Sequence, residues 1–225
     1  MGRPRTNDAT VKERLVKCAT ELLATRPQES VTVRAVATAA ETSTAAVYSL
    51  FGDKEGLIAA VRDRAVAGLF QALTAVPTSE DPLADIYALA AAYRRWGREH
   101  SHLYSVLFGG VQSFKPSGAV GAGDPVRPLI AAIGRAVTES VLDGEATAIA
   151  VSLWVSLHGL VTLELAGAFD APTAESAFRS TILATLRGWT APAAFGTTSP
   201  PSGGERDRPS VQRVEKRLAQ ERRRQ

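Results

Sequence analysis

The chain has few of the features that would place it outside the cytoplasm. Its 225 residues include a single cysteine, Cys18, which has no partner for an internal disulfide and therefore favours a reducing compartment. Apolar runs are short, and none approaches the ~20 residues that span a bilayer. The N-terminal stretch Met1–Arg5 is not followed by the apolar segment of a secretory signal. These absences predict a cytoplasmic protein with no membrane partner.

The sequence also lacks the signatures of catalysis. We find no P-loop, dinucleotide fingerprint or nucleophile elbow, and we therefore expect no enzyme, no catalytic residue and no cofactor. The best candidate for a metal site is Glu99–His102 with His158 and Glu164. Two histidines two residues apart on a helix point in different directions, and no other spacing resembles a zinc site. We expect no metal site, although metal sensing remains an alternative.

Charge is present, but it is unevenly distributed along the chain. Residues 1–64 carry a net charge of +2 and residues 191–225 carry +4, whereas residues 65–190 carry −3. Basic ends favour a polyanionic partner, although the effect is weak. The last of these segments is also rich in proline, glycine and polar residues, which predicts a disordered basic tail over 191–225.

Apolar residues recur at helical spacing along most of the chain, and no strand-like alternation is evident, so we predict an all-α fold. Thr10 is a candidate cap for the first helix, with Asn7 or Asp8 as alternatives, and Pro27 ends it. Cap and stop residues give about nine helices in total. After the first, the expected ranges are 33–40, 44–51, 53–75, 82–99, 101–108, 125–142, 143–168 and 172–189.

Two short helices separated by a tight turn are typical of the helix-turn-helix that reads DNA. Residues 33–40 and 44–51 fit this plan, with Thr32 and Ser43 as caps. The spacing alone also fits a purely structural helical hairpin. The residues expected to pack inward are Val36, Ala37, Ala40, Val47 and Phe51, and those expected to face outward are Thr44, Ala45, Tyr48 and Ser49.

The same segment resembles the signature of the tetracycline-repressor (TetR) family of bacterial regulators. The resemblance runs from about Arg14 to Leu57 and includes the stretch Thr32–Ala37. Its remaining matches at fixed spacing are Ala40, Ser43, Val47, Tyr48, Phe51, Lys54 and Leu57. The family implies an N-terminal three-helix DNA-binding domain and a C-terminal helical bundle that binds a ligand and forms a dimer.

The resemblance implies a role in DNA binding for each matching polar position. Thr32 and Tyr48 would bond phosphate oxygens, and Lys54 would meet a phosphate at the start of its helix. Base edges in the major groove would be approached by Ser43, Thr44, Ala45 and Ser49. Arg34 would reach either the backbone or a base.

The sequence departs from the family pattern in the turn and in the recognition helix. Glu41-Thr42 replaces the usual Gly-Val, although the turn favours a left-handed backbone conformation at a cost of ~1 kcal/mol for a residue other than glycine. Leu50 stands where many members have an aromatic residue or histidine. The helix 44–51 has no charged residue and no Asn or Gln. We therefore expect specificity to depend on methyl contacts, Arg34 and DNA shape.

Four segments are expected from these patterns. Residues 1–9 would form a flexible basic arm, in which Arg3 and Arg5 either enter a minor groove or belong to a frayed terminus. The DNA-binding domain would span residues 10–60, and the ligand-binding and dimerisation domain residues 61–190. The tail 191–225 would complete the chain.

The C-terminal part resembles those family members whose domain carries a Trp-His-Gly signature. The matching residues lie in 93–109 and in Trp154–Gly159, followed by Glu164. An apolar pocket with a few polar groups is the usual form of a small-molecule site, although each aromatic side chain here could equally belong to the core. The expected ligand-binding residues are Tyr93, Trp96, Tyr104, Phe108, Phe114, Trp154 and His158.

Family members dimerise through their last two long helices, and a ligand that favours a different dimer spacing releases the DNA. The candidate dimer contacts are Val151, Leu153, Leu157, Leu160, Leu183 and Leu186, which the sequence does not separate from intrachain core. The partners would be double-stranded DNA, an unidentified effector and a second copy of the chain. The resemblance thus implies a homodimeric repressor acting on a palindromic operator. The alternative is a helical adaptor that has lost specific DNA reading.

Overall fold

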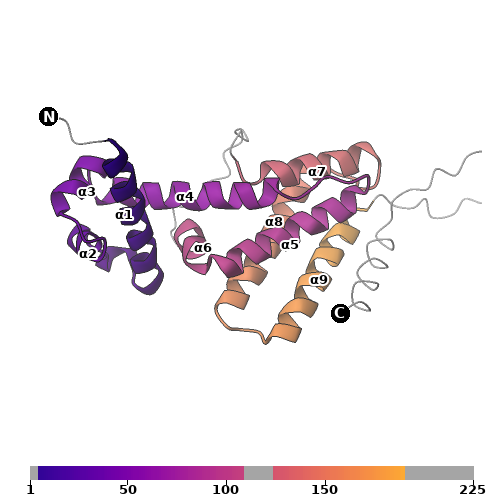
Figure 1. Cartoon of the computed structure of the whole chain (residues 1–225). Coiled ribbons are helices and arrows are strands. Elements are labelled where there is room, and N and C mark those ends of the chain that lie inside the picture. The colour runs from indigo at the N-terminus through magenta and orange to yellow at the C-terminus, as the bar shows by residue number, and fades with distance from the viewer. Residues whose placement is uncertain (1–4, 109–123, 191–225) are drawn as a thin grey trace, which may run out of the picture. The chain divides into compact units, whose positions relative to one another are not determined.

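The computed structural model describes residues 5–108 and 124–190, for residues 5–7 the backbone only. Over these residues the chain is all-helical, as predicted, with nine α-helices and one short 3-10 helix (Figure 1). The elements are α1 (Arg5–Thr25), η1 (Gln28–Ser30), α2 (Val33–Ala39), α3 (Thr44–Phe51), α4 (Lys54–Thr74), α5 (Pro82–Glu99), α6 (Ser101–Phe108), α7 (Arg127–Thr138), α8 (Ala146–Leu165) and α9 (Ala171–Gly188).

The chain divides into two compact units. The first contains the described residues up to Gln71 and those from Trp96 to Pro125, and the second contains Ala72–Arg95 and the described residues from Val126 onward. Helix α4 continues through the expected domain boundary at residue 60. The four-segment division of the chain stays a prediction, and Arg3, Phe114 and the tail lie outside the described residues.

The first unit is built on a core shared by α1, α2, α3 and the start of α4. Figure 1 shows the first three of these helices packed together. Four of the five side chains expected to point inward are buried, and Phe51 is partly buried against them. The fully packed residues are Leu15, Val16, Ala19, Val31, Val36, Ala37, Ala40, Val47, Leu57 and Val61.

Helix α1 begins at Arg5, five residues before the expected start at Thr10. The stretch between them contains no proline or glycine. Asp8 lies in the first turn, where a carboxylate interacts favourably with the positive end of the helix dipole. The helix therefore extends to a start that apolar periodicity alone did not reveal. Its end at Thr25, just before Pro27, agrees with the prediction.

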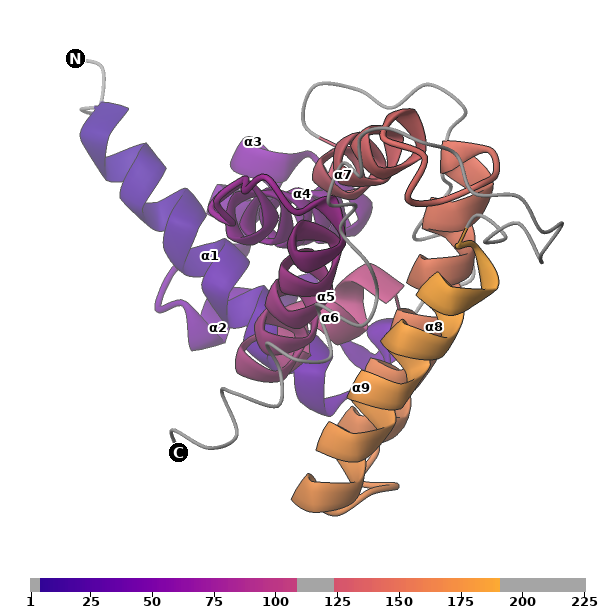
Figure 2. The same ribbon diagram turned by 90° about the vertical axis from the view of Figure 1, so that its right-hand side faces the viewer.

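In the second unit, α8 and α9 lie side by side as an antiparallel hairpin, as both views show (Figures 1 and 2). Apolar residues from several helices of the unit form its core. The fully buried larger ones include Leu83, Ile86, Ile133, Leu142, Ile149, Leu153, Ile182 and Leu186. Helix α8, with 20 residues and a mean hydropathy of 1.7, is long and apolar enough to cross a membrane, contrary to our reading of the sequence. Core helices of soluble proteins meet the same criterion, and part of α8 belongs to this core.

The boundaries of α7 and α8 differ from those expected. Helix α7 ends at Thr138 rather than Leu142, because Ser140 adopts a left-handed conformation with φ of 57°. The expected cap of α8, Asp143, is instead hydrogen bonded through its backbone N–H to the Trp189 carbonyl at 2.7 Å. The helix is capped by Glu145, whose carboxylate accepts from the N–H groups of Thr147 and Ala148 and consequently has a lowered pKa.

Candidate nucleic-acid interface

Helices α2 and α3 each begin at a hydroxyl side chain that serves as a cap. Thr32 Oγ1 accepts a hydrogen bond from the Ala35 N–H, and Ser43 Oγ accepts one from the Ala46 N–H, both at 3.2 Å. The two predicted caps are therefore confirmed. Each hydroxyl uses a lone pair in its cap and retains its proton, so it is still able to donate to a phosphate oxygen.

The turn between α2 and α3 is a Schellman motif centred on a glutamate. The Thr42 N–H donates to the Ala37 carbonyl at 2.9 Å, and the Glu41 N–H donates to Thr38 at 3.1 Å. Glu41 has φ of 48°, the left-handed conformation that the sequence predicted for this position. The motif is therefore intact without glycine, at a conformational cost of about 1 kcal/mol.

Helix α3 presents one exposed face that is free of charged residues. Thr44, Ala45 and Ser49 are exposed, and the Tyr48 side chain is 55% exposed, whereas Val47 on the opposite face is fully buried. The predicted division of this helix into inward and outward faces is confirmed. The exposed face offers hydroxyl groups and methyl groups, which suit phosphate oxygens and thymine methyls respectively.

The first turn of α4 already has internal partners for two of its groups. Lys54 is partly buried, and its Nζ donates to the Glu29 carbonyl in η1 at 3.3 Å. Asp53 Oδ1 accepts from the Gly56 N–H at 2.7 Å, so a carboxylate occupies part of the helix N-terminus that we expected to assist a phosphate contact. Lys54 has three donor hydrogens, and a phosphate role for it stays a prediction.

The 3-10 helix η1 has a second connection to α4 that the sequence did not predict. Arg62 Nη2 donates to Gln28 Oε1 at 3.4 Å. The two residues are 34 positions apart, and nothing in their local sequence indicates the pairing. Together with Lys54, this contact ties the segment before α2 to α4.

The three remaining basic candidates, Arg34, Arg5 and Arg3, differ in how much of each the structure describes. Arg34 is exposed on α2, one residue after the start of the helix. Arg5 is the first residue of α1, and its side chain lies outside the described residues, as does all of Arg3. A contact between either N-terminal arginine and DNA therefore stays a prediction.

Three of the expected ligand-binding residues meet in the second unit. Tyr93 on α5 is buried, and its hydroxyl lies 3.3 Å from His158 Nδ1 on α8. The Trp154 ring stacks on the His158 ring with centroids 5.5 Å apart. Partial burial disfavours the charged imidazolium and lowers the pKa of His158 below its ordinary value. The cluster therefore places an uncharged hydrogen-bonding pair, Tyr93 and His158, beside the aromatic ring of Trp154.

Three other expected ligand-binding residues belong to the first unit. Trp96 and Tyr104 are buried, and the Tyr104 and Phe108 rings lie 4.7 Å apart. The Trp96 ring packs near His100, and its indole lies close to Gly68 on α4. Phe114 lies outside the described residues. The structure thus brings the aromatic candidates into two groups, and effector binding by them stays a prediction.

The candidate dimer contacts separate into core and surface. Leu153, Leu157, Leu160 and Leu186 are buried within the chain's own core, so they are wrong as surface contacts. Leu183 is partly buried, and Val151 is exposed. The exposed large apolar residues of α8 are Val151, Val155 and Leu163, and only Val151 was among the expected dimer contacts.

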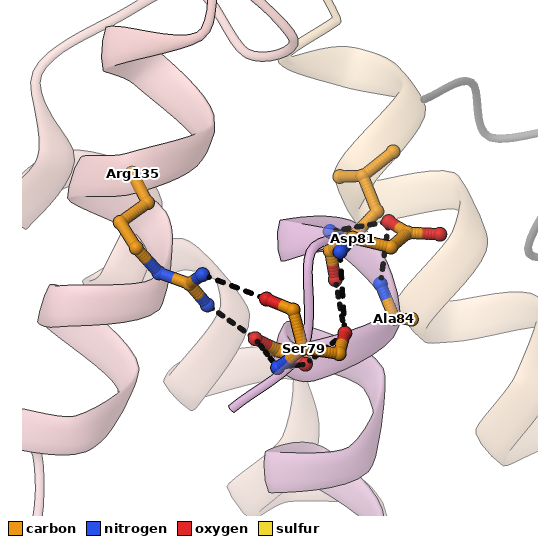
Figure 3. Close-up of polar contacts among 6 residues, drawn as sticks. Ser79, Asp81, Ala84 and Arg135 are labelled. Carbon is orange, nitrogen blue, oxygen red and sulfur yellow. Dashed lines mark hydrogen bonds and ion pairs between the residues drawn. The ribbon is translucent and has the colours of Figure 1, made fainter. Parts of the chain in front are cut away.

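Two clusters of charged side chains in the second unit, each centred on a buried residue, were not foreseen. In one, the Asp85 carboxylate on α5 accepts from the backbone N–H and hydroxyl of Ser79 and is bonded to Arg135 of α7. Arg135 also donates to the Ser79 carbonyl at 3.0 Å (Figure 3). Although burial opposes ionisation, these hydrogen bonds lower the pKa of Asp85 below its ordinary value. The cluster fixes the segment between α4 and α5 against α7.

The second cluster centres on Arg94, whose side chain bonds to Glu164 on α8 and Glu175 on α9. Burial by itself would lower the pKa of Arg94, but the hydrogen bonds to the two carboxylates raise it. Partners 70 and 81 residues away leave no local signal, which is why the sequence did not reveal them. Over the described part of the chain, no group of three or more His, Cys, Asp or Glu residues is placed to hold a metal ion.

Two family models match the chain. The model described as bacterial regulatory proteins of the tetR family matches residues 15–61, and the model of the tetracyclin repressor-like C-terminal domain matches residues 86–186. A curated relative, the uncharacterized HTH-type transcriptional regulator Rv0681 of Mycobacterium tuberculosis, is 28% identical over 196 residues, which cover 81% of this chain and 87% of the relative.

Solved structures show the same fold at lower sequence identity. The TetR family transcriptional regulator PfmR from Thermus thermophilus is 21% identical with a TM-score of 0.61, and the match covers 77% of this chain and 97% of PfmR. A putative tetR family regulator from a Shewanella species has a TM-score of 0.67 at 12% identity, covering 80% and 98% of the two chains. The Trp-His-Gly subgroup stays a prediction. The protein belongs to the TetR family of DNA-binding transcriptional regulators.

Proposed function

We propose that this regulator is a homodimeric repressor that binds a palindromic operator and is released from it by a small-molecule effector. The observation that carries the proposal is the exposed face of α3, which is held in place by the buried Val47. Helix α2, the Schellman turn and α3 have the arrangement of a DNA-reading helix-turn-helix, with α3 as the helix that enters the major groove.

The proposed reading of DNA divides the exposed side chains by chemistry. Thr32, Tyr48 and Lys54 bind phosphates and set the position of the protein on the duplex, while Arg34 reaches the backbone or a base. Ser43, Thr44, Ala45 and Ser49 approach base edges through hydroxyl and methyl groups. Because α3 offers no bidentate base reader, sequence-dependent DNA shape supplies a large part of the specificity.

A second copy of the chain is the proposed partner of α8. Val151, Val155 and Leu163 are roughly half exposed, and Val151 and Val155 lie on the side of α8 away from its buried leucines. Gly159 has open space around its Cα, which would let a second helix approach closely. A two-fold dimer through this surface would present two α3 helices to DNA, with half-sites about 34–36 Å apart.

The effector is proposed to bind at the aromatic candidates of the second unit and to favour a dimer whose recognition helices are differently spaced. Tyr93, His158 and Trp154 supply a hydrogen-bonding pair beside an aromatic ring, which suits a partly apolar molecule with a polar group. Helix α4 runs on from the DNA-binding domain and would transmit the change. Such a regulator acts in the cytoplasm, where the DNA is.

Selection from a random pool of DNA duplexes, followed by titrations at several salt concentrations, tests the proposal. The expected result is a palindromic consensus bound by two protomers, with higher affinity than scrambled DNA of equal length. Weak binding without a consensus, and with a steep salt dependence, would contradict specific reading and favour the helical adaptor. The Glu41 carboxylate in the turn is the feature that favours this adaptor reading.

A further inference from the structure

Arg94 on α5 is a buried cation with anionic partners on two other helices. Its side chain forms two parallel hydrogen bonds with Glu164 of α8, from Nε at 2.8 Å and from Nη2 at 3.0 Å. Its Nη1 donates to Glu175 of α9 at 2.7 Å. Its guanidinium carbon lies 4.9 Å from the centre of the Phe178 ring, also on α9. One side chain therefore contacts both helices of the α8–α9 hairpin.

The geometry of this cluster differs from that of a surface ion pair. The side chains of Arg94 and Glu164 are 8% and 11% exposed, so water screens their interaction very little. A planar guanidinium matches a carboxylate with two parallel bonds and thereby fixes its orientation as well as its distance. Lysine would preserve the charge, but its ammonium group does not reproduce this fork.

The residue next to Arg94 supplies a second connection to α8. The Tyr93 hydroxyl lies 3.3 Å from His158 Nδ1, six residues before Glu164 along the helix. Six residues correspond to about 9 Å of helix rise. Two attachments at different heights restrain both the position of α8 along α5 and its rotation about its own axis.

The rotation of α8 decides which of its side chains face outward. Leu163, immediately before Glu164, is 50% exposed, and Val151 and Val155 are exposed along the same helix. Successive residues on an α-helix are about 100° apart, so Val155, nine residues before Glu164, lies on the opposite side of α8, and holding Glu164 inward directs Val155 to the surface. The bond between Arg94 and Glu164, on the buried side of α8, thus sets the direction in which the exposed apolar residues of the helix point.

We propose that Arg94 is a positioning residue for dimer assembly, which holds the α8–α9 hairpin so that the exposed side of α8 meets its counterpart in a second copy. The inference rests on the proposed dimer. A purely structural role for Arg94 would change the stability of the fold alone. A positioning role also changes the affinity between protomers and the distance between their recognition helices.

The test compares Arg94→Lys with Arg135→Lys in the full chain. Arg135, which is partly exposed, forms the other arginine–carboxylate cluster, with the buried Asp85, and contacts neither α8 nor α9 through it. Both substitutions should lower the Tm, because each removes hydrogen bonds to a buried carboxylate. Sedimentation velocity over a concentration series should show that Arg94→Lys weakens dimerisation by about tenfold or more, with Arg135→Lys within about twofold of the unsubstituted chain.

A second variant covers the case in which Arg94→Lys fails to fold. Arg94→Met combined with Glu164→Leu and Glu175→Gln removes the charges of the cluster, and the amide oxygen introduced at position 175 still accepts from Arg179, which bonds to Glu175 at 3.1 Å. A spin label at Ser49→Cys in a Cys18→Ala background then reports the distance between the two α3 helices. The expected result is a broader or shifted distance distribution in this variant.

The results distinguish the positioning role of Arg94 from the homodimer on which that role depends. A folded, unsubstituted chain that remains monomeric at all concentrations would overturn the dimer and the inference together. A dimer whose affinity and label distance are unchanged in both Arg94 variants would overturn the inference and leave the dimer standing. Equal weakening by Arg135→Lys would also overturn it, because the effect would then follow from lost stability.

Discussion

The Thr42 N–H donates to the Ala37 carbonyl at 2.9 Å, and this bond closes α2 only if the residue between them, Glu41, is left-handed. A second Schellman turn, after α7, has Ser140 in the same conformation, whereas the turn after α8 has Gly167. Glycine is the residue that adopts this conformation without a steric penalty. The turn that positions the recognition helix is therefore kept at some cost in stability.

Replacing Glu41 with glycine should raise the free energy of unfolding by about 1 kcal/mol, because the left-handed strain disappears. Urea denaturation measures this change. Glu41→Gln is the matched control, since it removes the charge but keeps the strain. If repulsion between the Glu41 carboxylate and phosphates limits affinity, both variants should bind duplex DNA more tightly. An unfolding free energy for Glu41→Gly no higher than that of the unsubstituted chain would contradict the account of the turn.

Lys54→Ala distinguishes a phosphate contact from an internal brace. As a phosphate contact, Lys54 would contribute one released counterion, so its loss should weaken binding to all sequences and lower the salt slope by about one. The bond from Lys54 to the Glu29 carbonyl also holds η1, so Lys54→Ala should lower the Tm as well.

Tyr48→Phe should weaken DNA binding with little change in Tm, because the exposed hydroxyl is not part of the core. An unchanged affinity in both variants would refute the phosphate assignments.

Gly144→Ala should destabilise the second unit. Gly144 has φ of 140°, and a Cβ at this position would lie 2.9 Å from the Trp189 ring. The substitution therefore combines backbone strain with a clash at the junction of the α8 start and the α9 end. We expect a loss of about 1–3 kcal/mol in thermal or chemical denaturation.

Gly134→Ala provides the matched control for that measurement. Gly134 lies within α7, and a Cβ there would meet no atom within 4 Å. Alanine in a helix interior is favoured over glycine, so this variant should gain about 0.5–1 kcal/mol. Opposite signs for the two substitutions are expected, and a neutral Gly144→Ala would show that Trp189 moves aside freely.

The stability of the protein should fall on mild acidification because of His158. Partial burial lowers its folded-state pKa below the ordinary value of 6.5, so the unfolded chain binds more protons between the two values. The stability that comes from keeping His158 uncharged is fully present above about pH 6.5, and it is lost progressively as the pH falls toward the pKa of His158 in the folded state. The partly exposed position of His158 keeps the effect small.

His158→Asn should remove this part of the pH dependence. The measurement is the free energy of unfolding at several pH values between about 5.5 and 7.5, for the unsubstituted chain and the variant side by side. A profile for His158→Asn that parallels that of the unsubstituted chain would show that His158 is not the group responsible.

Local sequence determined the helix-turn-helix and most helix ends. Thr32 and Ser43 cap helices through atoms three residues away, and Pro27 excludes its neighbour from a helix. These effects depend on a few consecutive residues, so they are readable without a fold. The inward side of α3 followed from its 3.6-residue period for the same reason.

Tertiary structure decided what local patterns left open. Asp143 has the chemistry of a helix cap, but its position is taken by a backbone bond to Trp189, and Glu145 becomes the cap. Helix α8 is apolar on several sides, and only its packing assigns Leu157 to the core and Val155 to the surface. Arg94 finds its carboxylates across 70 and 81 residues. Pairings at such separations depend on the path of the whole chain, because only folding brings the partners within bonding distance.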